Sequence, residues 1–134
     1  MNNRIDILKA SRSKIKLCIE EFLENQDLKL NKKSRFRLKL ILTEMMGNAF
    51  CHGNKGIDES TIKVEWNLND RMISISIKDE GDGFDFNNIL ESGFKKEDSR
   101  GRGIFMVNQM VHELMFLEDG SKVVFRVDLD DLSE

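Results

Sequence analysis

The hydrophobic residues of the chain follow two kinds of spacing, one typical of helices and one typical of strands. Apolar residues three and four positions apart predict helices from about residue 11 to 25 and from about 32 to 52. Strict alternation predicts two antiparallel strands over residues 62–68 and 71–78, which Asn69-Asp70 joins in a tight turn. The chain therefore combines helices with an antiparallel sheet.

Weaker patterns predict the remaining elements. Residues 4–9 predict a short edge strand, and residues 115–117 and 122–128 predict two more strands. Residues 85–100 are polar and have the composition of a mobile loop with one short helix near 87–91, whereas the acidic tail from residue 128 is expected to be frayed. A helix follows this loop, and its apolar stripe comprises Ile104, Val107, Met110, Val111 and Leu114.

Composition restricts the class of protein. The 134 residues are 40% hydrophobic and 34% charged, which predicts a single globular domain over residues 1–134. A net charge of −3 argues against direct nucleic-acid binding. The apolar runs are short and the first residues lack the apolar core of a signal peptide, which predicts a cytoplasmic protein without a membrane span. Cys18 and Cys51 have no metal-ligand spacing, so we interpret both as ordinary helix residues.

Asp79 is the first candidate site residue. It continues the row of alternating isoleucines that ends at Ile77, so its side chain should point toward the interior, where an ionised carboxylate needs a partner. Gly81 and Gly83 follow it and allow a sharp turn with close approach of a ligand. The sequence leaves two interpretations open, a simple Asp-Gly turn or the floor of a pocket.

Glu44 and Asn48 form the second candidate pair. They are one helical turn apart and lie inside the apolar stripe of the second helix rather than opposite it. Polar residues are unusual on a buried face. They are a hydrogen-bonded pair within the core, two residues at the edge of the apolar stripe, or two groups that meet a ligand.

Arg100-Gly101-Arg102-Gly103 opens the helix after the polar loop. Glycines at a helix start leave amide N–H groups accessible to an anion, although glycine there is often only a cap. Four basic residues also crowd the start of the second helix, where they oppose the helix dipole unless an acidic partner compensates. They are Lys32, Lys33, Arg35 and Arg37, interpreted as a solvated face or a docking surface for a partner.

Together these parts meet the needs of a nucleotide bound with a divalent metal. A buried-side aspartate can accept a hydrogen bond from an exocyclic amine, glycine-rich segments can hold phosphates, and an asparagine oxygen is a suitable ligand for Mg²⁺. A glutamate one turn away can act as a base toward an attacking hydroxyl. The chain contains neither a Walker sequence nor a Rossmann glycine run.

In this order, the motifs resemble those of the GHKL (histidine-kinase-like, Bergerat-fold) ATPases. Residues 44–48 resemble the N box of that family, and residues 79–83 and 100–103 resemble its two glycine boxes. The short chain and the tract 79–86 are most similar to the bacterial anti-sigma factors that are also serine protein kinases. The resemblance implies an α/β (α+β) two-layer sandwich with a largely antiparallel mixed sheet backed by helices.

The resemblance also implies roles for individual residues. Asp79 would contact adenine, Asn48 would coordinate Mg²⁺, and Glu44 would be the general base. Gly81 and Gly83 would border the nucleotide. Ser121 stands where the family often has threonine and would keep a hydroxyl beside the adenine. The residues expected at the phosphates are Arg100, Gly101, Arg102 and Gly103.

The function implied is that of an ATP-binding anti-sigma regulator with serine/threonine protein kinase activity. Its expected partners are a sigma factor, an antagonist protein that it phosphorylates on serine, or both, and the family also implies a homodimer. One alternative is a non-catalytic module that binds ATP and a partner but transfers no phosphoryl group. Another is the catalytic half of a histidine kinase, which would need a dimerisation helix pair with a phosphoacceptor histidine.

Overall fold

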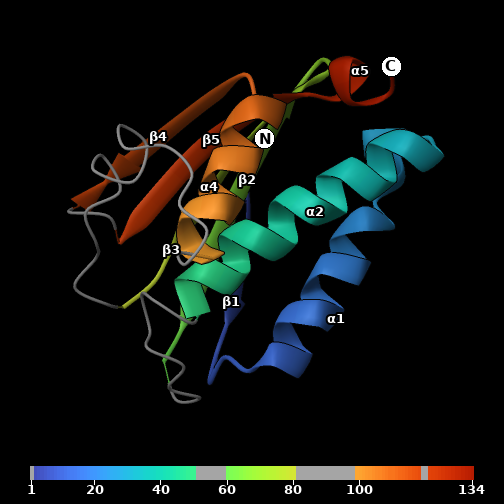
Figure 1. Cartoon of the computed structure of the whole chain (residues 1–134). Coiled ribbons are helices and arrows are strands. Elements are labelled where there is room, and N and C mark those ends of the chain that lie inside the picture. The colour runs from blue at the N-terminus through green and yellow to red at the C-terminus, as the bar shows by residue number, and fades with distance from the viewer. Residues whose placement is uncertain (1, 51–59, 81–98, 119–120) are drawn as a thin grey trace.

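The structure is a computed structural model, which describes residues 2–50, 60–80, 99–118 and 121–134. Figure 1 shows a sheet whose one face is covered by helices α1, α2 and α4, while α5 lies near the C-terminus. This two-layer arrangement confirms the predicted α/β sandwich. In the described part of the chain, no helix has the length and apolar character needed to cross a membrane.

The sheet has five strands in the order β1-β2-β3-β5-β4. Each neighbouring pair is antiparallel, so the described sheet is antiparallel throughout. β1 and β4 are the two edge strands, and β3 and β5 lie side by side near the centre. Their bounds are Asn2–Ile7 for β1, Ile62–Asn69 for β2, Met72–Lys78 for β3, Glu113–Leu117 for β4 and Lys122–Asp128 for β5.

Polar side chains fix where the first helices begin. The Ser11 side chain accepts a hydrogen bond from the Lys14 N–H and caps α1 (Arg12–Leu23). A short 3₁₀ turn, η1 (Gln26–Leu28), follows. Asn31 and Ser34 then form a reciprocal capping box at the start of α2 (Lys32–Asn48), so both predicted helix starts are confirmed.

The core lies between the helices and one face of the sheet. Ile73, Ile75 and Ile77 of β3 are all buried and alternate with partly exposed residues, as the sequence predicts for a strand with one covered face. The α2 stripe packs onto that face. Its fully or almost fully buried members are Leu38, Ile41, Leu42, Met45 and Met46.

Helix α4 (Ser99–Met110) ends earlier than the sequence predicts. The His112 N–H donates to the carbonyl oxygen of Arg126 in β5, at 2.8 Å, instead of continuing the helix. Leu114 consequently belongs to β4, and its assignment to the helix was wrong. The error arises because a spacing of three residues continues the helical pattern by chance across the helix–strand junction.

The acidic tail is also more ordered than predicted. Asp128 caps a short helix, α5 (Leu129–Leu132), by accepting hydrogen bonds from the Asp130 and Asp131 N–H groups. Leu129 is 0% exposed and Leu132 is 3% exposed, so these two residues anchor the tail in the core. The expectation of a frayed end from residue 128 was therefore wrong, because Leu129 and Leu132, the two leucines among the acidic residues, pack into the core.

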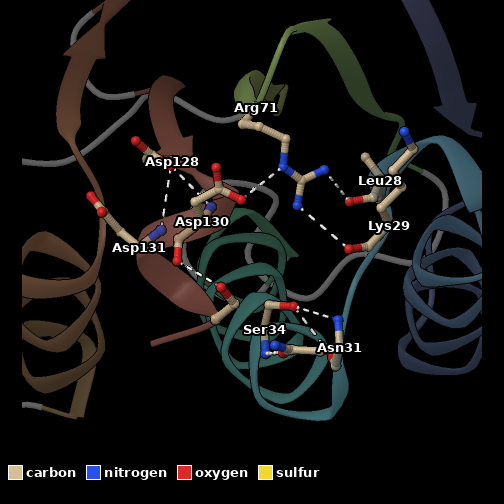
Figure 2. A network of polar contacts seen from close by, with 9 residues as sticks. Leu28, Lys29, Asn31, Ser34, Arg71, Asp128, Asp130 and Asp131 are labelled. Atoms are coloured by element: carbon tan, nitrogen blue, oxygen red, sulfur yellow. Dashed lines mark hydrogen bonds and ion pairs between the residues drawn. The ribbon is translucent and has the colours of Figure 1, made fainter.

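Arg71 ties α5 to the loop before α2, as Figure 2 shows. Its guanidinium donates to the Leu28 carbonyl oxygen at 2.8 Å and to the Lys29 carbonyl oxygen at 3.4 Å, and it pairs with Asp130 at 3.0 Å. Lys29 has a φ of 47°, a left-handed conformation that turns its carbonyl group in this loop. One arginine thus joins three segments that are distant in sequence.

Two of the four basic residues at the start of α2, Arg35 and Arg37, make contacts within the chain. Arg35 bonds the Leu23 carbonyl oxygen at 3.0 Å and pairs with Glu24 at 2.9 Å on α1. Arg37 donates to the carbonyl oxygens of Leu132 and Glu134 at the C-terminus. At Arg35, the acidic compensation that the helix dipole requires therefore comes from the chain itself.

Candidate nucleotide site

Asp79 and Ser121 face each other at the end of the β3–β5 ladder. The register pairs Lys78 with Lys122, which places Asp79 opposite Ser121, and the Asp79 N–H donates to the Ser121 carbonyl oxygen at 2.9 Å. Asp79 is 6% exposed and Ser121 is 9% exposed. The predicted inward direction of Asp79 is confirmed, and it results from the period-two alternation of the strand.

A small cavity lies beside this pair. Asn48 of α2 lines it together with Asp79 and Ser121, so three residues predicted for one site meet here although they are distant in sequence. The cavity has room of about 10 Å³ for a water molecule, close to the volume that holds one water. Its apolar walls come from Met45, Ala49, Ile77, Phe116 and Val123.

The side-chain amide of Asn48 lacks a hydrogen-bond acceptor. Its Nδ2 atom is buried and has no partner among the described residues. A hydrogen bond with the Glu44 carboxylate would have to use this donor, so the alternative of a hydrogen-bonded Glu44–Asn48 pair is wrong for this structure. An unpaired buried donor costs about 1–3 kcal/mol, and an acceptor from a ligand or a water would remove this cost.

The Glu44 carboxylate lies against the first turns of α4. A Cβ atom built on Gly103 would come within 2.1 Å of Glu44 Oε2. The two residues belong to separate sequence motifs, and α2 and α4 bring them into contact. The Glu44 side chain therefore extends from α2, one turn before Asn48, to the glycine-rich start of α4.

The turn between β4 and β5 holds Ser121 in place. The Ser121 hydroxyl donates to the Glu118 carbonyl oxygen at 2.9 Å, and Glu118 has a φ of 53°. The Glu118 carboxylate accepts a short hydrogen bond from the Lys78 ammonium, which lowers the pKa of Glu118. The Ser121 hydroxyl can still accept a hydrogen bond from a water or ligand.

The remaining predicted site residues are only partly placed. Gly81 and Gly83 lie outside the described residues, as do residues 85–98 of the loop predicted over 85–100 and the short helix predicted near 87–91. Residues 99 and 100 of the predicted loop belong to α4 instead. Arg100, Gly101 and Arg102 belong to the first turn of α4, where backbone N–H groups have no intrahelical acceptor. Their side chains are not described, so their contact with phosphates stays a prediction.

Phe116 is the cavity residue that sequence reasoning missed. It is partly buried on β4 and joins the cavity wall from the strand next to β5. A signal was present, since Phe116 is two residues after Leu114 and alternation places both on the covered face. The sequence did not indicate, however, that β4 would lie next to β5, the strand that Ser121 precedes.

The sheet, the helices on one face and this buried polar cavity define an α/β two-layer sandwich ATPase domain. The sequence matches the family model described as histidine kinase-like ATPase domain over residues 6–127, and the chain belongs to this family. The motif resemblance at the level of the GHKL-type ATPases is thereby confirmed. The match spans most of the chain and includes all the residues predicted for the site.

A solved structure supports the same fold. The histidine kinase domain of the blue-light activated histidine kinase from Erythrobacter litoralis EL346 superposes with a TM-score of 0.54 at 16% sequence identity. The superposition covers 75% of this chain and 47% of that chain, so the matched region is about half of the solved kinase domain. No curated protein sequence matches the chain.

Proposed function

We propose that the protein binds ATP with Mg²⁺ and acts as an anti-sigma regulatory factor with serine/threonine protein kinase activity. The observation that carries the nucleotide part is the meeting of Asp79, Ser121 and Asn48 at one cavity. In this proposal the Asp79 carboxylate accepts a hydrogen bond from the exocyclic amine of adenine. The first turn of α4 then binds the phosphates through its open N–H groups.

The residues fit Mg²⁺ when the nucleotide supplies the remaining ligands. The described residues contain no group of three or more His, Cys, Asp or Glu side chains that could hold a metal ion by themselves. Magnesium sites at nucleotides commonly combine one or two protein oxygens with phosphates and waters. Asn48 would provide the protein oxygen from its side-chain amide, and the bound ion would neutralise phosphate charge.

Glu44 is the proposed general base. It would accept the proton of the serine hydroxyl of an antagonist protein as the serine oxygen bonds to the γ-phosphorus. The bond between that phosphorus and the β–γ bridging oxygen breaks, and ADP leaves. The position of Glu44 against Gly103 supports this role, because it places the carboxylate beside the helix start where the phosphates would bind.

The proposed protein partners are a sigma factor, an antagonist protein that carries the target serine, or both. Among the four basic residues at the start of α2, Lys32 and Lys33 are exposed, while Arg35 and Arg37 make the intramolecular contacts described above. Lys32 and Lys33 are therefore the better candidates for contact with an acidic partner. A homodimer and a cytoplasmic location also belong to this proposal.

The alternative is a switch module that binds ATP and a partner without phosphoryl transfer. The two functions are separated by incubating the protein with γ-labelled ATP and its cognate antagonist protein, beside the Glu44→Gln variant. Transfer of label to serine that is lost in Glu44→Gln supports the kinase. Nucleotide-dependent capture of a sigma factor without any transfer would support the switch, and absence of ATP binding would contradict both.

A further inference from the structure

A second hollow lies on the other side of α2, away from the nucleotide cavity. It is a groove of about 290 Å³ between α1 and α2. Ile15 and Ile19 of α1 form one apolar wall, and Phe50, which follows α2, contributes another. Gly47 also lines the groove, between Glu44 and Asn48 in sequence.

The backbone does not explain the glycine at position 47. Gly47 lies in the last turn of α2, and a Cβ atom built on it meets no described atom within 4 Å. Glycine inside a helix costs about 1 kcal/mol relative to alanine. Gly103 is different, because a side chain there would meet Glu44. At position 47, the effect of the missing side chain is to leave the groove open.

The rim of the groove carries an excess of positive charge. Arg12, Lys16 and Lys39 are basic, and Glu20 is the one acidic residue lining it among those described. Lys39 pairs with Glu20 at 2.7 Å. The hydrogen bond from Lys39 and the positive charge of Lys39 lower the pKa of Glu20, and the charge of Arg35 adds a smaller effect. The one acidic group among the described rim residues is thus already neutralised by its neighbours.

We propose that the groove between α1 and α2 binds a small amphiphilic anion, such as a carboxylate with an aliphatic or aromatic body. The apolar body would pack on Ile15, Ile19 and Phe50, and the anionic group would lie at Lys16. Small-molecule sites typically enclose about 300–1,000 Å³, so the groove of about 290 Å³ lies just below the smallest of these sites. Its size suits one compact molecule, and its charge selects an anion.

The position of the groove suggests a regulatory effect. Gly47 lies in the same helical turn as Glu44 and Asn48, so a ligand against it contacts the back of the turn that faces the nucleotide. A change in ATP affinity on ligand binding would have to be matched by an equal change in ligand affinity on ATP binding. The binding proposal itself stands without the proposed phosphoryl transfer, and its test needs no activity.

The test uses the full chain with octanoate as the anionic probe and 1-octanol as its neutral counterpart, both titrated in a calorimeter. Gly47→Leu fills the groove, and Lys16→Glu reverses one rim charge. Lys63→Glu makes the same charge change at an exposed position of β2 and is the matched control. Thermal unfolding checks that each variant is folded, and Thr43→Trp, at an exposed rim position, obstructs the groove if Gly47→Leu does not fold.

We expect saturable 1:1 binding of octanoate, weakened at least tenfold by Gly47→Leu or Thr43→Trp and severalfold by Lys16→Glu. Lys63→Glu should bind like the unmodified protein, and octanol should bind more weakly than octanoate. Absence of saturable binding, or equal affinity in the groove-filling variant, would overturn the proposal. If octanoate does not bind and Lys16→Glu loses binding of a partner protein, the groove is assigned to that protein and the small-anion proposal is overturned.

Discussion

The Glu44 carboxylate occupies the space into which a side chain at position 103 would project. A Cβ atom on Gly103 would lie 2.1 Å from Glu44 Oε2 and 3.0 Å from Glu44 Cδ, both far inside van der Waals contact. Only glycine at position 103 lets Glu44 keep this position. The contact gives the second glycine of the Gly-Arg-Gly segment a role that is independent of any phosphate.

Gly103→Ala should therefore displace the Glu44 side chain while leaving the fold intact. If Glu44 is the general base, phosphoryl transfer to the antagonist protein should fall about tenfold or more, since general bases contribute about 10²–10⁴-fold. Gly103 is also expected at the phosphates, so the transfer rate is compared at saturating ATP, where a change in nucleotide affinity does not affect it. Separate measurements of nucleotide affinity and of the single-turnover rate check this expectation.

The double variant Gly103→Ala with Glu44→Asp provides the control. Aspartate is one methylene shorter and leaves room for the new methyl group, so the two changes should be less than additive in their effect on the rate. If the unmodified protein transfers phosphoryl groups and Gly103→Ala transfers them equally fast, the positioning role of Gly103 is refuted. If the unmodified protein transfers none, the proposed kinase activity fails instead.

Asp79→Asn should weaken ATP binding strongly while the fold persists. The substitution conserves shape but replaces a charged acceptor with an amide, and a hydrogen bond to a charged group contributes about 1.5–3 kcal/mol, or about 10- to 100-fold in affinity. Equilibrium titration with a fluorescent ATP analogue measures the loss. Asp6→Asn, at an exposed position of the edge strand β1, is a matched control that should bind normally. Normal affinity in Asp79→Asn would contradict the proposed adenine contact.

Arg71 should contribute to stability mainly through its bonds to backbone carbonyls. Arg71→Met keeps much of the side-chain stem but removes the bonds to Leu28, Lys29 and Asp130, and should lower the free energy of unfolding by about 1–3 kcal/mol. Asp130→Asn removes only the ion pair, and the Asp130 side chain is 65% exposed, so its cost should stay below about 1 kcal/mol. Urea unfolding of both variants measures the difference, and equal costs would contradict this division.

Reversing the charges of Lys32 and Lys33 should weaken partner binding without affecting ATP affinity. Both side chains are exposed, so Lys32→Glu with Lys33→Glu should leave the fold largely unchanged. Arg35→Glu, in contrast, places a carboxylate beside Glu20 and Glu24 and should destabilise the packing of α1 on α2. Capture of the cognate partner and thermal unfolding distinguish the two effects. Unchanged partner binding in the double lysine variant would remove this surface from the proposal.

The Lys78–Glu118 pair should make stability depend on pH in the acid range. The hydrogen bond from Lys78 lowers the pKa of Glu118 in the folded protein, so the pair stabilises the fold above the unfolded-state pKa of about 4.5. This contribution is lost as the pH falls below that value and through the lowered folded-state pKa. Glu118→Gln should therefore lose less stability than the unmodified protein between pH 5 and pH 3, as urea unfolding at each pH would show. Parallel curves would contradict the effect.

Particular residues show how far the sequence predicted the fold. The helix starts near residues 11 and 32 and the alternation of β2, β3 and β5 were predicted correctly because capping and periodicity are local properties. The predictions for Leu114 and for the C-terminal tail were wrong because the placement of these residues depends on contacts with β5, α2 and Arg71. Local patterns could not reveal these partners.

The sequence by itself predicted the site as an ordered set of motifs. Glu44, Asn48, Asp79 and the Gly-Arg-Gly segment were predicted by spacing and by their resemblance to one family; the family match confirms the family, and the roles of these residues stay predictions. Side-chain type and period also determined that Asp79 points inward, because the pleat of a strand fixes the direction of every second residue.

Only the tertiary structure decided which of these residues meet. The β3–β5 register places Asp79 opposite Ser121, the packing of α2 against α4 places Glu44 on Gly103, and the divergence of α1 and α2 leaves the groove at Gly47. The physical reason is that the first two contacts join residues 40 or more positions apart, and the groove lies between two separate helices. They depend on how whole elements pack, which no local pattern specifies.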